Sequence, residues 1–413
     1  MSIPAGSLVH VAGKNALDRL QSAGLGDVNL PVETIRETGN REVVDKVTGE
    51  PDFTFSMESY DASTEVMAWL TGEVGGGIGS GAGAGAADPD GTEYSWLDAA
   101  SRCLNIISPW KDESTGSAGD IEAGHLIPGY YPTKLNMRFG VTDNSSFTVE
   151  FGGGSFFYAK ATPEEDYFTA SAEQKAFESV HPTIHYRKGG VAGSTFRDVF
   201  GVIVDGDLQT EGVDYVVSGG NGSKAIVEFT IAPVTGADVR FCYFTADAKA
   251  YPQTIHPAVV VKPGAVRGRN IRIKLNGQRV GNGQSFELEA TVEGEVEREL
   301  GNEEIIGRTV NGTDVNGTFT VRSKDSDAFF KLLNEITGVE EDEVFGWFND
   351  NTVSLDIEIE NPKNPGTLLK TVRVKQAKFQ PPGTPARVNQ PTDFAISWSA
   401  LDGTFSDFKG EAP

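Results

Sequence analysis

One segment of this chain alternates polar and apolar residues without a break from Phe286 to Leu300. Alternation with a period of two is the pattern of a β-strand, whose successive side chains point to opposite faces of a sheet. Glutamates occupy most of one face, namely Glu287, Glu289, Glu293, Glu295, Glu297 and Glu299. Because an isolated buried carboxylate is very costly, this face must contact water. The segment therefore predicts a long strand with an acidic, solvent-facing side.

The surroundings of this strand have a counterpart near the start of the chain. Arg36–Val44 reads RETGNREVV, and Arg298–Ile306 reads RELGNEEII. The Gly-Asn pair in each stretch is a turn signal. After the turn, each copy continues with an alternating strand and then with an Asp that precedes an apolar helical face. The same strand–turn–strand–helix unit is thus predicted near residues 27–70 and 289–333, and with it a tandem duplication of one domain.

Both copies carry acidic residues on the polar side of their first strand. In the N-terminal copy, Val28, Leu30 and Val32 fall on the apolar side. The candidate residues of the polar side, over both copies, are Asp27, Glu33, Glu37, Glu287, Glu289, Glu293, Glu295, Glu297 and Glu299. Two interpretations remain open. This side is either the solvated outer face of a β-sandwich, which composition alone favours, or the wall of an acidic channel.

Other segments predict further elements. Residues 135–141 and 353–360 alternate as strands do, and residues 371–375 predict a strand after a loop. The basic residues Arg373 and Lys375 are expected to pair across this hairpin with Glu358 or Asp356. Residues 94–108 and 165–180 predict short helices.

The remaining segments indicate the domain boundaries. Residues 72–92 are dominated by glycine, which is typical of a flexible arm. Residues 196–247 contain four short strands joined by turns, which indicates a small β module. We therefore expect a first domain at residues 1–180 that includes the Gly-rich arm, the β module at 181–250, and a second domain at 251–413.

The chain is strongly acidic, with 59 Asp and Glu residues against 35 Lys and Arg residues and a net charge of −24. Such a surface repels nucleic acid and anionic membranes at long range, although DNA can pass along it without sticking. No apolar run is long enough to span a membrane. Residues from Met1 to Ala16 show no signal peptide. We expect the protein to be made in a cytoplasm and not to insert into a membrane.

The sequence carries no motif typical of an enzyme or of a metal site. Cys103 and Cys242 lie in apolar surroundings, which predicts two buried free thiols. His181 and His185 have the spacing of a metal-binding pair on a helix, but Pro182 favours a strand. We therefore expect no catalytic residue, no bound metal and no cofactor.

The repeated unit resembles the major tail tube protein of tailed bacteriophages and tailed archaeal viruses. The resemblance lies in the strand that leads to Arg-Glu-x-Gly-Asn, the alternating strand after it, and an Asp that precedes a helix ending in Trp69-Leu70 or Leu332-Leu333. Members of that family have a β-sandwich or partly closed barrel with one helix. Their long strands line a continuous lumen, and some members carry two fused tube domains that form three-fold rings.

The resemblance implies a mainly β chain with a duplicated tube domain, an additional β module and a place in the virion tail. Its implied partners are further copies of the chain in stacked trimeric, pseudo-hexameric rings, a tape-measure protein, tail-tip or terminator proteins, and double-stranded DNA that passes without specific binding. Two alternatives stay open. One is a ring protein of the tail tip, neck or baseplate with the same fold, and the other is a β-rich adhesin or carbohydrate-binding protein.

Overall fold

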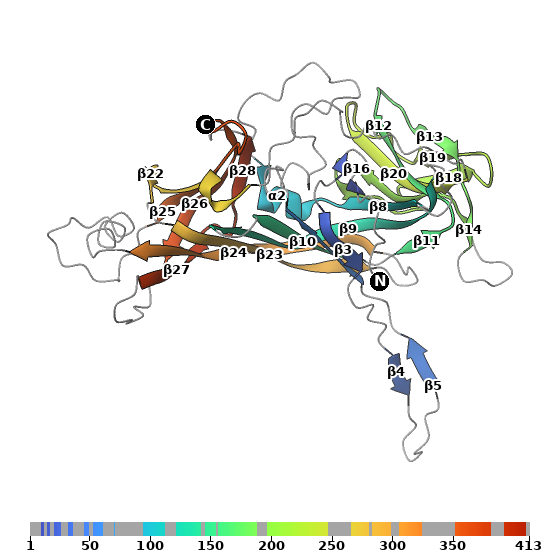
Figure 1. Ribbon diagram of the computed structural model, residues 1–413. Coiled ribbons are helices and arrows are strands. Elements are labelled where there is room, and N and C mark those ends of the chain that lie inside the picture. Colours follow the sequence, from blue (N-terminus) through green and yellow to red (C-terminus); the bar gives the residue numbers. More distant parts are fainter. Residues whose placement is uncertain are drawn as a thin grey trace, which may run out of the picture.

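The computed structural model describes residues 10–11, 15–16, 20–25, 32–35, 45–48, 53–60, 70, 94–111, 121–141, 145–153, 156–187, 196–246, 266–280, 283–298, 305–323, 352–380 and 392–409. Nearly all elements in this part are antiparallel β-strands, which confirms the expected mainly β fold (Figure 1). Its helical residues are Leu70, α2 (Trp96–Ser101) and the 3-10 helix η3 (Gly268–Asn270). The Gly-rich segment 72–92 and the helix predicted at 325–333 lie outside the described residues.

A first set of strands comes from the N-terminal part of the chain. Its members are β1 (His10–Val11), β2 (Asn15–Ala16), β3 (Leu20–Leu25), β6 (Phe53–Ser59), β8 (Leu104–Lys111), β9 (Ile121–Gly140), β10 (Ser146–Gly153) and β11 (Phe157–Ala159). They pair in the order β2–β1–β8–β9–β10–β6–β3. β11 pairs with the N-terminal half of β9.

A second set comes from the C-terminal part of the chain. Its members are β21 (Ile271–Leu275), β22 (Gln278–Arg279), β23 (Gly283–Arg298), β24 (Ile305–Ser323), β25 (Val353–Glu360), β26 (Leu368–Phe379), β27 (Thr392–Ala400) and β28 (Ser406–Lys409). They pair in the order β22–β21–β25–β26–β27–β24–β23, and β28 pairs with β26. Within its own set, each of these strands thus has the same place along the chain and the same neighbours as its counterpart in the first set.

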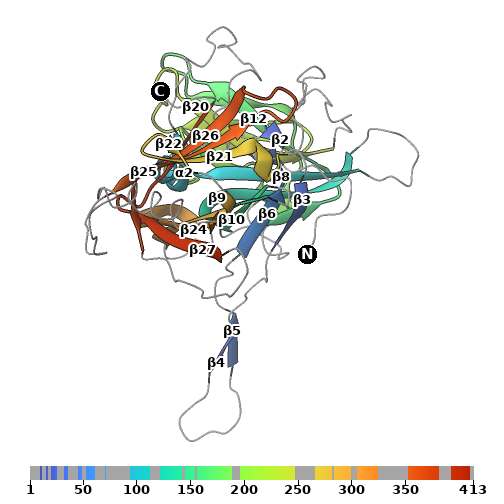
Figure 2. The same ribbon diagram turned by 60° about the vertical axis from the view of Figure 1, so that its left-hand side comes forward.

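The long hairpins of the two sets also share one register. β4 (Val32–Ile35) pairs with β5 (Asp45–Thr48) on either side of Gly39-Asn40, as β23 pairs with β24 on either side of Gly301-Asn302. The two Gly-Asn pairs are 262 residues apart, since 301 − 39 = 262. Strand partners recur at that spacing: Val32 with Thr48 and Gly294 with Val310, then Glu33 with Val47 and Glu295 with Thr309. The β4–β5 hairpin projects away from the other strands (Figures 1 and 2).

The two sets join edge to edge. The C-terminal half of β9 pairs with β23, from Lys134 opposite Thr291 to Gly140 opposite Ser285. This seam produces one continuous sheet in the order β3–β6–β10–β9–β23–β24–β27–β26, which forms the lower layer in Figure 1. β9 and β26 each continue into a second layer, where they pair with β8 and β25. We call the first of these layers the shared sheet.

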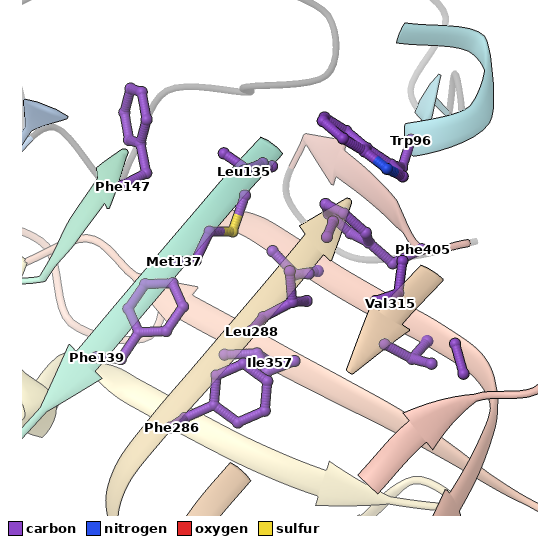
Figure 3. Packing of buried hydrophobic residues seen from close by; sticks show 14 of the residues in the cluster. Trp96, Leu135, Met137, Phe139, Phe147, Phe286, Leu288, Val315, Ile357 and Phe405 are labelled. Carbon is purple, nitrogen blue, oxygen red and sulfur yellow. The ribbon is translucent and has the colours of Figure 1, made fainter. Parts of the chain in front are cut away.

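One hydrophobic core lies against the shared sheet and contains residues of both sets (Figure 3). A row of directly opposed residues illustrates the pattern, and all of its members are buried: Met57, Val149, Leu135, Ala290 and Val315. Each fully buried side chain of Leu or Met size contributes about 1.5–3 kcal/mol. Among the described residues, the strands before and after the expected boundary at residue 251 thus share one core, and the boundary itself lies outside the described residues.

The long strand predicted from Phe286 is β23, and its two faces differ as expected. Phe286, Leu288 and Ala290 are buried, whereas Glu293 and Glu295 are exposed. Two irregularities on β24 interrupt the pairing without changing which side of β23 faces the core. Period-two alternation predicted this strand correctly because one of its faces has a core to pack against.

Between the two sets lies a module of two sheets. The first sheet has the order β12 (Thr162–Thr169)–β20 (Asp238–Thr245)–β16 (Phe200–Val204)–β17 (Asp207–Leu208). The second has the order β13 (Ala176–Pro182)–β19 (Lys224–Phe229)–β18 (Tyr215–Gly219), and a small ribbon pairs β14 (Tyr186–Arg187) with β15 (Phe196–Arg197). Because β12 and β13 pair with β20 and β19, the module begins at Thr162, before the expected boundary at 181.

Two helix predictions differ from the structure. Residues 165–180 lie mostly in β12 and β13, where Phe168 and Phe177 pack into the core of the module. Residues 94–108 contain a helix only at α2, and Leu104 begins strand β8. Both faces of β8 are apolar, since Ile106 faces the main core and Ile107 faces the module. A strand covered on both sides lacks the alternation that would have distinguished it from a helix.

The module packs on the sheet of β8 and β9, on the side away from the main core. Ile107 and Leu126 of that sheet pack against Phe200 and Phe244 of the module. The corresponding strands of the second set carry ion pairs on this side, namely Arg373–Asp356, Lys274–Glu358 and Arg272–Glu360. The pair between Arg373 and Asp356, at 2.8 Å, confirms one of the predicted cross-hairpin contacts. An exposed apolar side is unfavourable in water, and the module buries the apolar side of the sheet of β8 and β9.

A buried polar contact fixes the module on the first set. Asn105 of β8 donates through Nδ2 to Glu165 Oε1 and to the Gly201 carbonyl, both at 2.9 Å, and its Oδ1 accepts from Gly129 N–H at 3.1 Å. Tyr167 Oη also donates to Glu165, at 2.8 Å. Burial raises the pKa of Glu165 from 4.5 to about 7, although the nearby Arg240 opposes this rise. The folded protein therefore favours the protonated, neutral form of the Glu165 carboxyl group.

Glu165 is expected to make stability depend on pH. The Glu165 carboxyl group loses its proton near pH 4.5 in the unfolded chain and near pH 7 in the folded protein. Its contribution to the free energy of unfolding is therefore complete below pH 4.5 and is lost as the pH rises to 7. The loss in the free energy of unfolding is about 3 kcal/mol. Glu165→Gln, which cannot ionise, should therefore gain stability relative to the parent between pH 5 and pH 8. Urea midpoints measured at both pH values test this, and parallel pH profiles of the two proteins would contradict it.

Candidate functional site

The candidate site is the side of the shared sheet that faces away from the core, which we call the polar face. A row of opposed residues crosses all eight strands and contains only polar side chains: Ser22, Glu58, Thr148, Asn136, Glu289, Asn316, Ser399 and Lys378. Strand geometry places these residues on one side, because directly opposed residues share a face. The acidic strand is therefore part of a wide polar surface that both sets of strands build.

The structure describes some of the predicted acidic residues with their side chains, one by its backbone alone, and others not at all. Glu293, Glu295 and Glu297 are exposed on β23, and Glu287 and Glu289 are partly covered. Glu33 lies on β4, and its side chain is not among those described. Three predicted residues lie outside the described part of the chain: Asp27, Glu37 and Glu299. The 262-residue spacing relates Asp27 to Glu289, Glu33 to Glu295 and Glu37 to Glu299.

Two basic residues of β9 pair with glutamates of β23 across the seam. Arg138 Nη2 lies 3.0 Å from Glu287 Oε1, and Lys134 Nζ lies 3.0 Å from Glu289 Oε1. Exposed pairs of this kind add little stability. Their effect is electrostatic: each base has its charge balanced by a neighbouring carboxylate, so it attracts an anion less strongly.

The sequence did not identify Lys134 and Arg138 as site residues. Lys134 and Arg138 alternate with Leu135 and Met137, so their exposure on a strand could have been expected. Their position beside the glutamates could not, because β9 and β23 are far apart along the chain and their register is set by tertiary pairing. Two further bases belong to this face: Arg322 of β24 is opposite Asp393 of β27, and Lys378 of β26 is opposite Ser399.

The polar face has few features that could support catalysis. In the part of the chain that the structure describes, no group of three His, Cys, Asp or Glu side chains could hold a metal ion. His181 lies on strand β13, as Pro182 suggested, and His185 Nδ1 lies 2.6 Å from Asp198 Oδ1 inside the module. Carboxylates, hydroxyls and amides along the described strands of this face can repel an anion or hydrate a solute.

The two cysteines are buried free thiols, as predicted. Burial raises the pKa of both Cys103 and Cys242, so neither thiol ionises readily. Among the described helices, none is long and apolar enough to cross a membrane. Neither a protein-family model nor a curated protein matches this chain.

Proposed function

We propose that this chain is the tail tube subunit of a tailed virus, and that its polar face lines the tube. One observation carries the proposal: two strand sets of identical order form one continuous sheet whose exposed side is polar and acidic. Identical order and hairpin register are what a tandem duplication of one tube domain would produce. The resemblance of the repeated hairpin to tail tube proteins adds to this interpretation.

A ring follows if the seam between the sets is repeated between chains. Within one chain, β23 of the second set pairs with β9 of the first. The counterpart of β23 is β3, which pairs only with β6 among the described residues. If β3 pairs with the second set of a neighbouring chain, the polar face continues from chain to chain. Such a head-to-tail contact closes into a ring when the rotation allows it. By resemblance we propose three chains, and thus six tube domains, per ring.

The proposed mechanism is passive conduction. DNA carries one negative charge per roughly 1.7 Å, and basic side chains that bind its phosphates would slow its movement. On the polar face, glutamates outnumber bases, and Lys134 and Arg138 are already paired with carboxylates. The wall would thus repel the genome and let it slide. The remaining proposed partners are the tape-measure protein inside the tube and tail-tip or terminator proteins at its ends, in the virion.

The module would lie outside the tube. It packs on β8 and β9 from the side away from the main core, and the core separates it from the polar face. In Figure 1 it lies above β8, whereas the shared sheet lies below. A decorating role on the outer surface is therefore proposed for it.

Electron microscopy of the purified full-length protein tests the proposed function. We expect stacked rings or tubes with a continuous central channel, formed at high protein concentration. Single closed rings that never stack would favour a ring protein of the tail tip, neck or baseplate. Monomers that persist at high concentration would contradict both.

A further inference from the structure

A second contact accompanies the seam between β9 and β23. β7 (Tyr94–Ser95) belongs to the first half of the chain but pairs with β28 of the second set. Directly after it, Trp96 lies stacked on Phe405, with ring centroids 6.4 Å apart and planes inclined by 19°. Trp96 N–H donates to the Phe405 carbonyl at 2.9 Å, and its ring Nε1–H donates to the Thr291 carbonyl at 3.3 Å. The Trp96 side chain is fully buried, so its contacts stabilise the packing of the two sets against each other.

A similar stretch, with an aromatic residue two positions before a Trp, occurs in the second half. Tyr94-Ser95-Trp96-Leu97 has its counterpart in Phe345-Gly346-Trp347-Phe348. Each stretch follows the second strand of a long hairpin and precedes the next strand of its set, β8 or β25. Residues 345–348 lie outside the described part of the chain, so this correspondence rests on sequence and chain order. In the first half, the stretch contacts the set that follows it, but within one chain no third set follows the second.

The surface that would receive residues 345–348 exists in the first set. Phe156 directly precedes β11, as Phe405 directly precedes β28, and the two strands pair with the corresponding strands β9 and β26. β28 uses its other edge to pair with β7. Among the described residues, β11 pairs only with β9. Tyr158 of β11 is 56% exposed, and Phe156 is partly exposed.

We infer that the edge of β11, with Phe156, is the docking site for residues 345–348 of a second copy of this chain, and that Trp347 stacks there on Phe156. The inference rests on the proposed ring and names its second contact. Each copy offers Trp347 from its second half and receives the Trp347 of its other neighbour on its first half. The interface is therefore head-to-tail, and a face-to-face dimer would not use it.

The chemistry of the two contacts differs in one respect. Within the chain, the fully buried Asp407 of β28 pairs with Lys370 at 3.1 Å. At the corresponding place in the first set stands Tyr158, whose ring lies 5.5 Å from that of His125. Phe156 flanks His125 at 4.7 Å. The contact between copies thus brings aromatic side chains together at this place, and aromatic side chains are typical anchors of protein interfaces.

Disulfide trapping tests the inference. By the pairing of Asp407 with Tyr94, the residue opposite Tyr158 is Phe345 of the neighbouring copy. Two single variants of the full-length chain, Tyr158→Cys and Phe345→Cys, are assembled as a mixture and oxidised. Non-reducing electrophoresis should show that about half of the chains run as covalent dimers, because opposed strand residues lie within reach of a disulfide and a random equal mixture places the two different variants in the productive order at about a quarter of the contacts. Each variant assembled alone is the matched control and should stay free of covalent dimers, since Cys103 and Cys242 are buried.

The outcomes separate this inference from the proposed tube. Rings or tubes by microscopy without covalent dimers in the mixture would overturn the docking site and leave the tube standing. Covalent dimers in the mixture without any tube would support the docking site and count against the tube. Dimers of either single variant alone would indicate a face-to-face contact and overturn the inference. Monomers throughout, under both readouts, would overturn both proposals.

Discussion

Replacing Glu293, Glu295 and Glu297 together by lysine is expected to turn the polar face from a surface that repels DNA into one that binds it. All three side chains are exposed on β23, so the change should leave the core and the assembly of the tube intact. Each added phosphate contact releases condensed counterions and steepens the salt dependence of binding by about 0.9 in log K against log salt. Binding of duplex DNA to assembled tubes should therefore appear in the variant and weaken steeply with salt. Ejection of DNA from particles carrying it should be slowed.

A matched control uses exposed glutamates of the module. Glu173, Glu178 and Glu228, each replaced by lysine, give the same change in net charge on the proposed outer surface. These changes should leave ejection unaffected, even if DNA binds the outside of the tube. Equal slowing by both triple variants would mean that overall charge matters, and that the polar face does not line the channel. If the Glu293, Glu295 and Glu297 variant fails to assemble while the control assembles, these glutamates would instead lie in a contact between subunits.

Removing the carboxylate of Asp407 is expected to produce the largest loss of stability. Asp407 and Lys370 are almost completely buried, and their charged atoms lie 3.1 Å apart between β28 and β26. Asp407→Ala leaves the ammonium group of Lys370 buried without this partner, which typically costs about 3–5 kcal/mol. The loss should appear as a lower urea midpoint. It should also loosen β7 from β28, because Asp407 is directly opposite Tyr94.

The double variant Lys370→Met, Asp407→Leu is the control for this prediction. It removes both charges and keeps side chains of similar size, so most of the lost stability should return. A midpoint of the single variant close to that of the parent would contradict the prediction. A double variant as unstable as the single one would show that the shape of the site matters more than the ion pair.

Local patterns predicted the elements that have one buried and one exposed face. β23, β25 and the C-terminal half of β9 alternate with a period of two, and each was predicted at its observed place. The Gly-Asn turns predicted the two hairpins, β4–β5 and β23–β24, because these residues favour tight turns. The same approach gave a helix for residues 165–180, where β12 and β13 form opposite sheets of the module. Local periodicity does not indicate which faces a distant segment will cover.

The burial of acidic residues shows the same division. Asp356, Glu358 and Glu360 alternate with apolar residues, as the glutamates of β23 do. The structure buries them, each with a relative exposure of 7–8%, beside Arg373, Lys274 and Arg272. An acidic row can be buried when bases from neighbouring strands neutralise it. In β23, two such bases neutralise glutamates: Arg138 lies beside Glu287, and Lys134 lies beside Glu289. The glutamates further along this strand, from Glu293 to Glu297, are exposed.

By itself, the sequence determined that the chain is mainly β, that a hairpin unit occurs twice, and that one long strand has an acidic side in contact with water. These properties follow from the period of two, from turn chemistry and from the cost of burying carboxylates, all of which act over a few residues. Only the tertiary structure decided that β9 pairs with β23, and thereby that the two sets share one sheet and one core. That pairing depends on which distant edges bury the most apolar surface together, and no local pattern records it.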